Sequence, residues 1–192
     1  MNSLFPRPPS SQARHAKGVN FTELVKVLRV RRRTQPLVGL SAEGEAMLSV
    51  RVLASEWYSH EALLDLLRYA YRELLGRSDE AAHQMGIVGG HAVLQGAHRA
   101  FISPGNPAAS VTNMGVIWKA YFDFGELTNE ADGDHACTFR LTGYDDMPSV
   151  HGMMIAGWAV AAAQIGGAPS ARCEFLEKPW RGAPRFQYRV SF

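Results

Sequence analysis

The most regular alternation of apolar and polar residues lies at the end of the chain. Residues 186–192 read Phe-Gln-Tyr-Arg-Val-Ser-Phe, and this period of two predicts a strand with one buried face. The stretch from Pro148 to Gly166 is dominated by small and apolar residues, which predicts a helix that covers the sheet. A shorter alternation at residues 171–175 predicts a strand that forms a hairpin with the last one.

Another hairpin is predicted before that helix. Residues 126–131 and 135–144 flank Asp132-Gly133, a pair typical of a two-residue type I′ turn. In the second arm Cys137, Phe139 and Leu141 share one face because side chains alternate along a strand. This face is expected to pack against the core.

Helical periodicity dominates the first two thirds of the chain. The predicted helices cover residues 20–34, 60–75, 78–96 and 107–125, with a short helical turn at 41–45. Asn20 and Glu23 occupy the positions of a capping box, and Ser59, Ser78 and Asn106 are typical N-caps. The acidic pair Asp145-Asp146 is interpreted as capping the last helix. Several glycines interrupt the segment 78–96, which indicates either close backbone packing or a break in the helix.

The order of elements is helices, hairpin, helix, hairpin, which predicts an α+β domain with an antiparallel sheet covered by helices. Residues 1–19 are rich in proline and poor in apolar residues, and we interpret them as a flexible leader. Residues 20–192 are then expected to form a single domain.

Composition excludes several classes of protein. The 192 residues are 46% hydrophobic and carry a net charge of +2, too weak a field to require nucleic acid as a partner. Two cysteines are too few for a secreted disulfide framework. The apolar run 152–163 is too short to span a bilayer. A cytoplasmic protein without a membrane span is therefore expected.

No segment of the chain contains a recognisable catalytic motif. The chain has no P-loop, no Rossmann fingerprint, no Gly-x-Ser-x-Gly elbow and no His-Glu-x-x-His motif. Cys137 and Cys173 are interpreted as buried small hydrophobic residues, although Cys137 could pair with His135 or His151 in a dyad. An enzyme of unassigned type that uses Cys137 or a histidine is therefore an alternative, and no catalytic residue is assigned.

A basic cluster closes the first predicted helix, and it consists of Arg29, Arg31, Arg32 and Arg33. Cations at a helix C-terminus complement the helix dipole, so a structural role is favoured. The alternative is a basic patch that contacts nucleic acid or an acidic partner.

Four features in order resemble a family of myxobacterial paralogues. They are Trp57-Tyr58 before a leucine-rich helix, the glycine-rich segment 86–96, Ile117-Trp118 with the stretch 122–127, and the closing Gly157-Trp158 helix with its hairpin. That family is similar to vinyl-reductase-type sensor domains, heme-nitric-oxide-binding domains and TRAPP subunits. The resemblance covers residues 20–192. It implies an N-terminal helical layer packed on a twisted antiparallel sheet of about four strands, an apolar pocket and a homodimer.

The departures from those relatives concern their cofactors. Vinyl-reductase-type sensors hold zinc through a glutamate and two cysteines near the last hairpin, whereas here Glu174 is followed by Lys178, Trp180 and Phe186 and by no cysteine. Heme-binding relatives need a Tyr-x-Ser-x-Arg triplet, which this chain lacks. No metal and no cofactor is therefore predicted.

The leading hypothesis is a non-enzymatic binding module in bacterial signalling, either a small-ligand sensor or a protein-interaction adaptor. Its motivation is a predicted apolar pocket or groove, for which aromatic, methionine and histidine side chains are the candidate lining. These candidates are Trp118, Tyr121, Phe122, Met153, Met154, Trp158, His91, His98 and His151. The alternative interpretation is that all of them are core residues.

Overall fold

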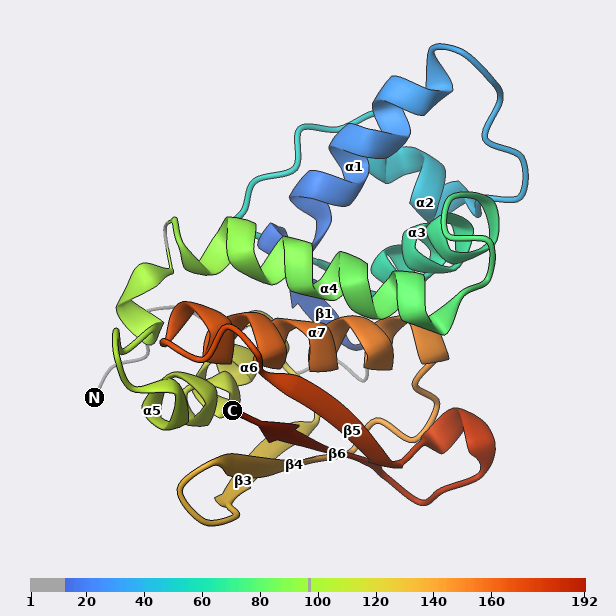
Figure 1. Cartoon of the computed structure of the whole chain (residues 1–192). Helices are drawn as coiled ribbons and strands as arrows, with labels where there is room; N and C mark the ends of the chain where they lie inside the picture. Colours follow the sequence, from blue (N-terminus) through green and yellow to red (C-terminus); the bar gives the residue numbers. More distant parts are fainter. Residues whose placement is uncertain (1–12, 97) are drawn as a thin grey trace. The chain divides into compact units, whose positions relative to one another are not determined.

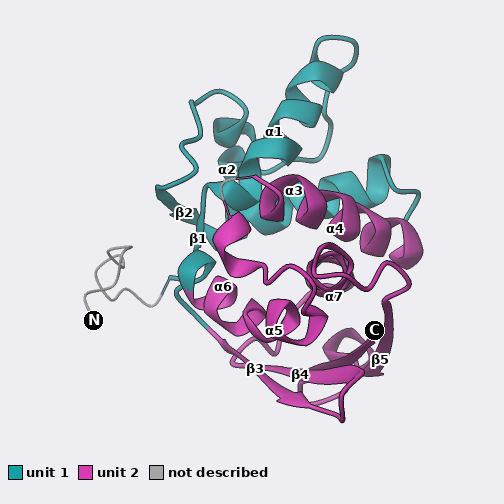
Figure 2. Cartoon of the chain, turned by 60° about the vertical axis from the view of Figure 1, so that its left-hand side comes forward, with its two compact units in different colours: residues 1–77, 120–124 teal, residues 78–119, 125–192 magenta. Residues whose placement is uncertain are grey.

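The computed structural model describes residues 13–96 and 98–192, and it divides the chain into two compact units (Figure 2). Unit 1 contains the described residues up to Arg77 together with the short segment Ala120–Phe124. Unit 2 contains Ser78–Lys119 and Gly125–Phe192. Most of the predicted leader, residues 1–12, lies outside the described residues. The expectation of one domain over residues 20–192 stays a prediction.

Unit 1 combines three helices with a small two-stranded antiparallel sheet. Its elements are β1 (His15–Lys17), α1 (Val19–Arg32), α2 (Ala42–Met47), β2 (Trp57–Ser59) and α3 (His60–Glu73). Strand β1 lies within the stretch that the sequence pattern assigned to a flexible leader, and that assignment is wrong for residues 15–17. Three residues are too few for periodicity to reveal a strand, because the pairing with β2 defines it.

The segment 120–124 belongs to unit 1 because it is bonded to β1. Ala16 forms an isolated β-bridge with Phe122. The backbone N–H of His15 donates to Oδ1 of Asp123 at 2.7 Å, and His15 Nδ1 lies 2.8 Å from Oδ2 of the same carboxylate. One aspartate thus binds both the backbone and the side chain of His15.

The N-cap of helix α1 lies two residues before the predicted one. Gly18 is the N-cap, without a side-chain cap, and Asn20 lies inside the helix with its amide donating to the carbonyl of Lys17. A Cβ on Gly18 would lie 2.0 Å from the carbonyl oxygen of Leu53, so only glycine allows this approach. The buried face consists of Phe21, Val25 and Leu28.

Helix α3 follows its sequence pattern closely. The side chain of Ser59 accepts a hydrogen bond from the backbone N–H of Ala62, so the predicted cap is present. Leu63, Leu67 and Ala70 are almost inaccessible to solvent. Gly76 follows the helix with φ of +58°, the left-handed conformation that glycine adopts without strain. This helix is the centre of the unit 1 core.

Unit 2 contains the remaining helices and the larger sheet. Its elements are α4 (Asp79–Leu94), the 3-10 turn η1 (Arg99–Phe101), α5 (Pro107–Thr112), α6 (Met114–Tyr121), β3 (Glu126–Ala131), β4 (Ala136–Thr142), α7 (Ser149–Ile165), β5 (Arg172–Glu177), the 3-10 turn η2 (Pro179–Arg181) and β6 (Phe186–Ser191). The last two residues of α6 belong to unit 1.

The sheet of unit 2 has four antiparallel strands in the order β3-β4-β6-β5. Helix α7 covers this sheet on one side and packs along α4 on the other, so three layers lie on top of one another (Figure 1). A helix covered on both sides must be apolar all round, which explains the composition of residues 149–165. The predicted α+β class, with helices packed on a four-stranded antiparallel sheet, is confirmed.

Helices α4 and α7 approach each other at backbone contact distance. A Cβ on Gly86 would lie 2.4 Å from the carbonyl oxygen of Met154, and a Cβ on Gly157 would lie 2.4 Å from the carbonyl oxygen of His83. Glycine at both places allows the two backbones to touch. The glycines of segment 78–96 therefore reflect close packing, and the helix continues without a break to Leu94.

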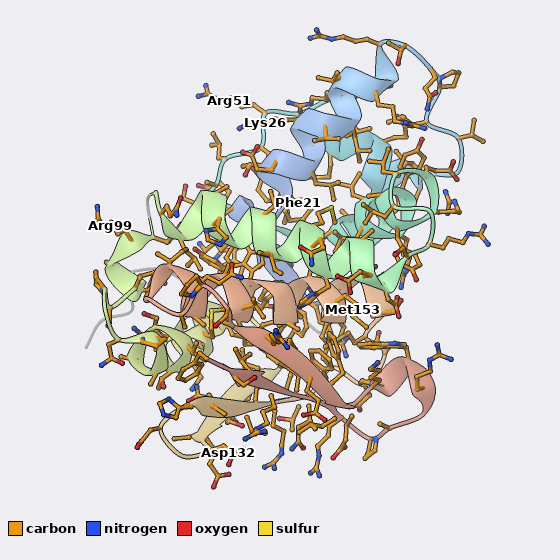
Figure 3. All side chains as sticks on the ribbon, in the orientation of Figure 1. Phe21, Lys26, Arg51, Arg99, Asp132 and Met153 are labelled. Carbon is orange, nitrogen blue, oxygen red and sulfur yellow. The ribbon has the colours of Figure 1, made fainter. Side chains whose placement is uncertain are left out.

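Three local predictions were wrong. The hairpin loop after Ala131 is longer than two residues, because Ala131 pairs with Cys137. Asp132, labelled in Figure 3, closes the base of this loop by donating its backbone N–H to the carbonyl of Ala136 at 2.9 Å. The helix predicted over 107–125 is two helices, α5 and α6, that meet at Asn113. The N-cap of α7 is Pro148, without a side-chain cap, so Asp145 and Asp146 do not cap it through their side chains.

Candidate functional site

The predicted pocket residues do not all belong to one compact unit. Tyr121 and Phe122 lie in unit 1, and the others lie in unit 2. Tyr121 and Phe122 are 4% and 6% exposed, and Phe122 contacts the buried ring of His60 edge-on at 6.1 Å. Burial raises the pKa of Tyr121 above its ordinary value. These two aromatics belong to the core of unit 1.

His151 is the centre of a small buried group in unit 2. Its Nδ1 lies 2.9 Å from the hydroxyl of Tyr144, and its ring centroid lies 6.5 Å from that of Trp118. All three side chains are at most 4% exposed. The structure therefore brings two of the predicted residues, Trp118 and His151, together with a tyrosine that the sequence did not single out.

The other candidates of unit 2 lie along α7 and α4. Met153 is buried on α7 (Figure 3), whereas Met154 and Trp158 lie against the glycines of α4. His91 is held by a polar contact between its Nε2 and the side-chain oxygen of Gln164 at 2.8 Å. Met154, Trp158 and His91 therefore lie at the contact between α4 and α7.

His98 lies apart from those helices, after the end of α4. Its ring stacks on that of Phe101 at 6.1 Å, and burial lowers its pKa. His91 and His98 are on different elements, because α4 ends at Leu94 and His98 precedes η1.

The arginine cluster at the end of α1 is partly used inside unit 1. The guanidinium of Arg29 donates to the carbonyls of Leu48 at 3.0 Å and Met47 at 3.3 Å, at the C-terminus of α2. Arg32 forms an ion pair with Glu45 at 3.3 Å. A cation at the C-terminal end of a helix stabilises the helix dipole, and here the favoured dipole is that of α2.

Both cysteines flank the same residue of β6. Cys137 on β4 and Cys173 on β5 each pair with Val190, so they lie two strand spacings apart, roughly 9–10 Å. That separation is too large for a disulfide without movement of the backbone. Burial raises the pKa of Cys137 to about 11 and that of Cys173 to about 12. At neutral pH both groups are thiols, which are poor nucleophiles.

Sequence reasoning missed an aromatic cluster beside β5. We call it the β5 cluster, and its members are His83, Phe175, Trp180, Phe186 and Tyr188. Ring-centroid distances are 5.8 Å for His83–Phe175, 6.3 Å for Phe175–Phe186, 5.5 Å for Trp180–Phe186 and 5.0 Å for Phe186–Tyr188. The cluster reaches from the partly exposed His83, Phe175 and Trp180 to the fully buried Tyr188.

Three polar atoms of the β5 cluster are buried without a hydrogen-bond partner among the described residues. They are Nε2 of His83, Nε1 of Trp180 and the hydroxyl of Tyr188. A buried polar group left unsatisfied costs about 1–3 kcal/mol. Such groups are rare in folded proteins, and here three of them lie around one pair of phenylalanine rings.

The position of Trp180 explains how the cluster is held. Its six-membered ring packs on Gly152 of α7, where a Cβ would lie 2.4 Å from the ring. Glu177 and Arg185 form a bidentate ion pair, with distances of 3.0–3.1 Å, across the hairpin that carries Trp180. No helical or strand periodicity signals these contacts, because they depend on where η2 folds back.

The comparisons with known proteins give a fold and no sequence family. No protein-family profile matches the chain. No curated protein matches it. An H-NOX protein mutant from K. algicida has 13% identity and a TM-score of 0.60, with 91% of this chain and 95% of that chain covered. An H-NOX protein from S. oneidensis has 11% identity and a TM-score of 0.59, with 91% and 98% covered.

The chain has an H-NOX-like fold. A subunit 3 of the trafficking protein particle complex from Naegleria fowleri, covalently bound to palmitic acid, is also similar. Its identity is 14%, its TM-score is 0.52, and 68% of this chain and 93% of that chain are covered. These neighbours support the predicted sensor and TRAPP-like fold. Membership of the myxobacterial family stays a prediction, as does the list of predicted site residues.

Heme is the cofactor that an H-NOX-like fold implies, since a further match, 12% identical with a TM-score of 0.59, concerns heme redox potential. Heme iron binds a histidine nitrogen that points at the metal. In this chain His91 Nε2 is bonded to Gln164, and the Tyr-x-Ser-x-Arg triplet is missing from the sequence. His151 Nδ1 is bonded to the hydroxyl of Tyr144. The described residues do not fit heme, and we derive no heme chemistry.

Two absences among the described residues bear on site chemistry. Among residues 13–96 and 98–192, no three or more His, Cys, Asp and Glu side chains gather closely enough to hold a metal ion. The same part of the chain contains no helix of the length and hydropathy needed to cross a membrane.

Proposed function

We propose that this chain is a non-enzymatic binding module, a sensor that takes a small ligand at the β5 cluster of unit 2. The observation that carries the proposal is the group of three buried polar atoms around Phe175 and Phe186 that have no partner among the described residues. A ligand that supplies those hydrogen bonds would recover free energy that the chain alone loses. The H-NOX-like fold supports a sensor rather than an enzyme.

The protonation of the cysteines supports the non-enzymatic part of the proposal. Cysteine catalysis needs a thiolate, and burial holds Cys137 and Cys173 as thiols far above neutral pH. Cys137 is also only 3% exposed. A thiol reagent in solution therefore has little access to Cys137, and the thiol that it reaches is unreactive.

Native mass spectrometry of the protein purified from its own host tests the proposal. We expect a small noncovalent adduct on the wild type that is lost in Phe175→Ala. The matched control is Phe101→Ala, which removes a partly exposed ring of unit 2 that stacks on His98, outside the cluster. An adduct that survives Phe175→Ala, or none on the wild type, would contradict a ligand at this site.

An adaptor function is the second candidate, and the outer face of α1 favours it. Val27 and Val30 are 52% and 62% exposed, and Arg33 beside them is exposed as well. Apolar side chains flanked by positive charge fit an acidic amphipathic helix of a partner protein. Arg29 does not contribute to this surface in the same way, because it is bonded to α2.

A synthetic helix with leucines on one face and glutamates beside them probes this surface. We expect binding that weakens with salt and is lost in the Val27→Ser/Val30→Ser variant. Val88→Ser on α4, which is 68% exposed in unit 2, is the control. Equal binding by all three proteins would exclude α1 as the docking surface.

Several finer expectations belong to the same proposal. A sensor of this kind would act in the cytoplasm, in bacterial signalling, and as a homodimer. Sedimentation analysis at micromolar concentration decides between monomer and dimer. No nucleic acid is expected as a partner, since the net charge is only +2.

A further inference from the structure

The polar groups around the β5 cluster are hydrogen-bond donors. The indole Nε1–H of Trp180 can only donate, and the hydroxyl of Tyr188 and Nε2 of His83 can both donate. None of the three atoms has an acceptor among the described residues. An incoming molecule that satisfies them must therefore carry acceptor atoms.

Lys178 adds a positive charge to the same place. Its Nζ lies 4.9 Å from the centroid of the Phe175 ring, and no carboxylate of the described residues pairs with it within 4 Å. The nearest carboxylate in sequence, Glu177, is already neutralised by Arg185. An ammonium group over an aromatic ring is partly desolvated, which strengthens its attraction for an anion.

Negative groups near the cluster are exposed. Glu80 acts electrostatically on His83, and Glu174 acts on Cys173. Both glutamates lie on the surface, where water and salt screen their charges. These glutamates weaken the attraction for an anion but do not form an ion pair with Lys178.

We propose that the β5 cluster binds a small carboxylate with an apolar body, its carboxylate at Lys178 and the buried donors and its apolar part on Phe175 and Phe186. Ionised carboxylates accept several hydrogen bonds at once and form stronger ones than neutral acceptors. The aromatic rings supply the apolar surface. This inference rests on the proposed small-ligand function and specifies the class of ligand.

Two pairs of probes test the inference on the full chain. 3-Phenylpropionate is compared with 3-phenylpropanol, and decanoate with decanol, so that each pair differs only in the charged end. The readout is the ¹H–¹⁵N signal of the Trp180 indole, assigned by its loss in Trp180→Phe. We expect each carboxylate to shift this signal and to bind at least tenfold more tightly than its alcohol.

Variants of Lys178 separate charge recognition from the site itself. Lys178→Met keeps the length of the side chain and is expected to abolish the preference for the acid, whereas Lys178→Arg keeps it. Because the ammonium has no ion pair among the described residues, Lys178→Met should lower the melting temperature only slightly, through loss of the cation–π contact with Phe175. Lys178→Arg should leave it unchanged. Lys119→Met, which removes an exposed lysine of α6, is the control.

The outcomes distinguish the inference from the proposed function. Equal affinity for acid and alcohol at Trp180 would overturn the carboxylate inference and leave a small-ligand site. An indole signal unmoved by all four probes at millimolar concentration would overturn both. If only one of the two carboxylates binds, the apolar body is identified as aromatic or aliphatic.

Discussion

At the scale of single residues, burial decides protonation in this protein. His60 is fully buried in unit 1, next to the rings of Phe122 and Phe124. Burial, followed by the charges of Arg14 and Arg68, lowers its pKa to about 3. The histidine is therefore neutral throughout the physiological pH range. Its protonation would destabilise the folded state.

Acidification should therefore destabilise unit 1. The folded-state pKa of His60 lies below its ordinary 6.5, so the unfolded state takes up the proton more readily. The stabilising contribution is complete above pH 6.5 and is lost as the pH falls towards 3, by about 1.4 kcal/mol per pH unit in that range. Urea unfolding at pH 7, 6, 5 and 4 measures it.

The control for this experiment is His135, an exposed histidine of the β3–β4 loop. We expect His60→Phe to flatten the dependence between pH 6.5 and 5, and His135→Gln to leave it unchanged. An unchanged slope in His60→Phe would show that other groups carry the acid sensitivity.

The cysteines provide a second residue-scale prediction. At pH 7.5 the folded protein should react slowly with a thiol reagent at both Cys137 and Cys173, because burial raises the pKa of each thiol. In urea both should react at the rate of a free cysteine. Rapid labelling of either cysteine in the folded state would revive the enzyme alternative.

At the scale of elements, backbone contact between α4 and α7 is the strictest requirement of unit 2. Gly86 and Gly157 lie where the two backbones touch, whereas a Cβ on Gly89 would lie 3.5 Å from the indole nitrogen of Trp158, an ordinary contact distance. The same residue type is thus indispensable at one position of α4 and replaceable three residues later.

Substituting these two glycines by alanine should give opposite results. Gly86→Ala forces the helices apart and should destabilise the protein by about 1–3 kcal/mol or more. Gly89→Ala should be neutral or stabilise by up to about 1 kcal/mol, because alanine favours the helix. Urea unfolding of both variants measures the two changes in the free energy of unfolding. Equal changes in Gly86→Ala and Gly89→Ala would mean that the helices tolerate separation at Gly86.

At the scale of the whole molecule, an H-NOX-like fold does not by itself imply that the chain binds heme. The ring nitrogen of His91 is bonded to Gln164, and the chain lacks the propionate-binding triplet. We therefore expect that heme mixed with the folded protein shows no spectrum of a histidine-ligated iron. Such a spectrum, lost in His91→Ala or His151→Ala, would contradict this expectation.

Much of the fold was predictable from local pattern. The strands β4 and β6, helix α3 and the serine caps of α3 and α4 follow from alternation, helical spacing and capping chemistry. The β5 cluster was not predicted, and the predicted pocket residues come together only in part. Trp118 and His151 do lie together, but Tyr121 and Phe122 belong to unit 1, because α6 ends where the chain pairs with β1.

The sequence by itself determined that the last 45 residues form an apolar helix and a hairpin, since periodicity depends only on neighbours along the chain. Only the tertiary structure decided which side chains that stretch gathers. In the sequence, Lys178, Trp180 and Phe186 stand where vinyl-reductase-type sensors carry metal ligands, and no pattern showed that they would cluster. The fold places Phe175 against His83, almost a hundred residues earlier in the chain. Lys178, Trp180 and Phe186 join the same cluster, where three buried polar atoms have no partner among the described residues. Hydrogen-bond satisfaction depends on three-dimensional neighbours, which no local pattern specifies.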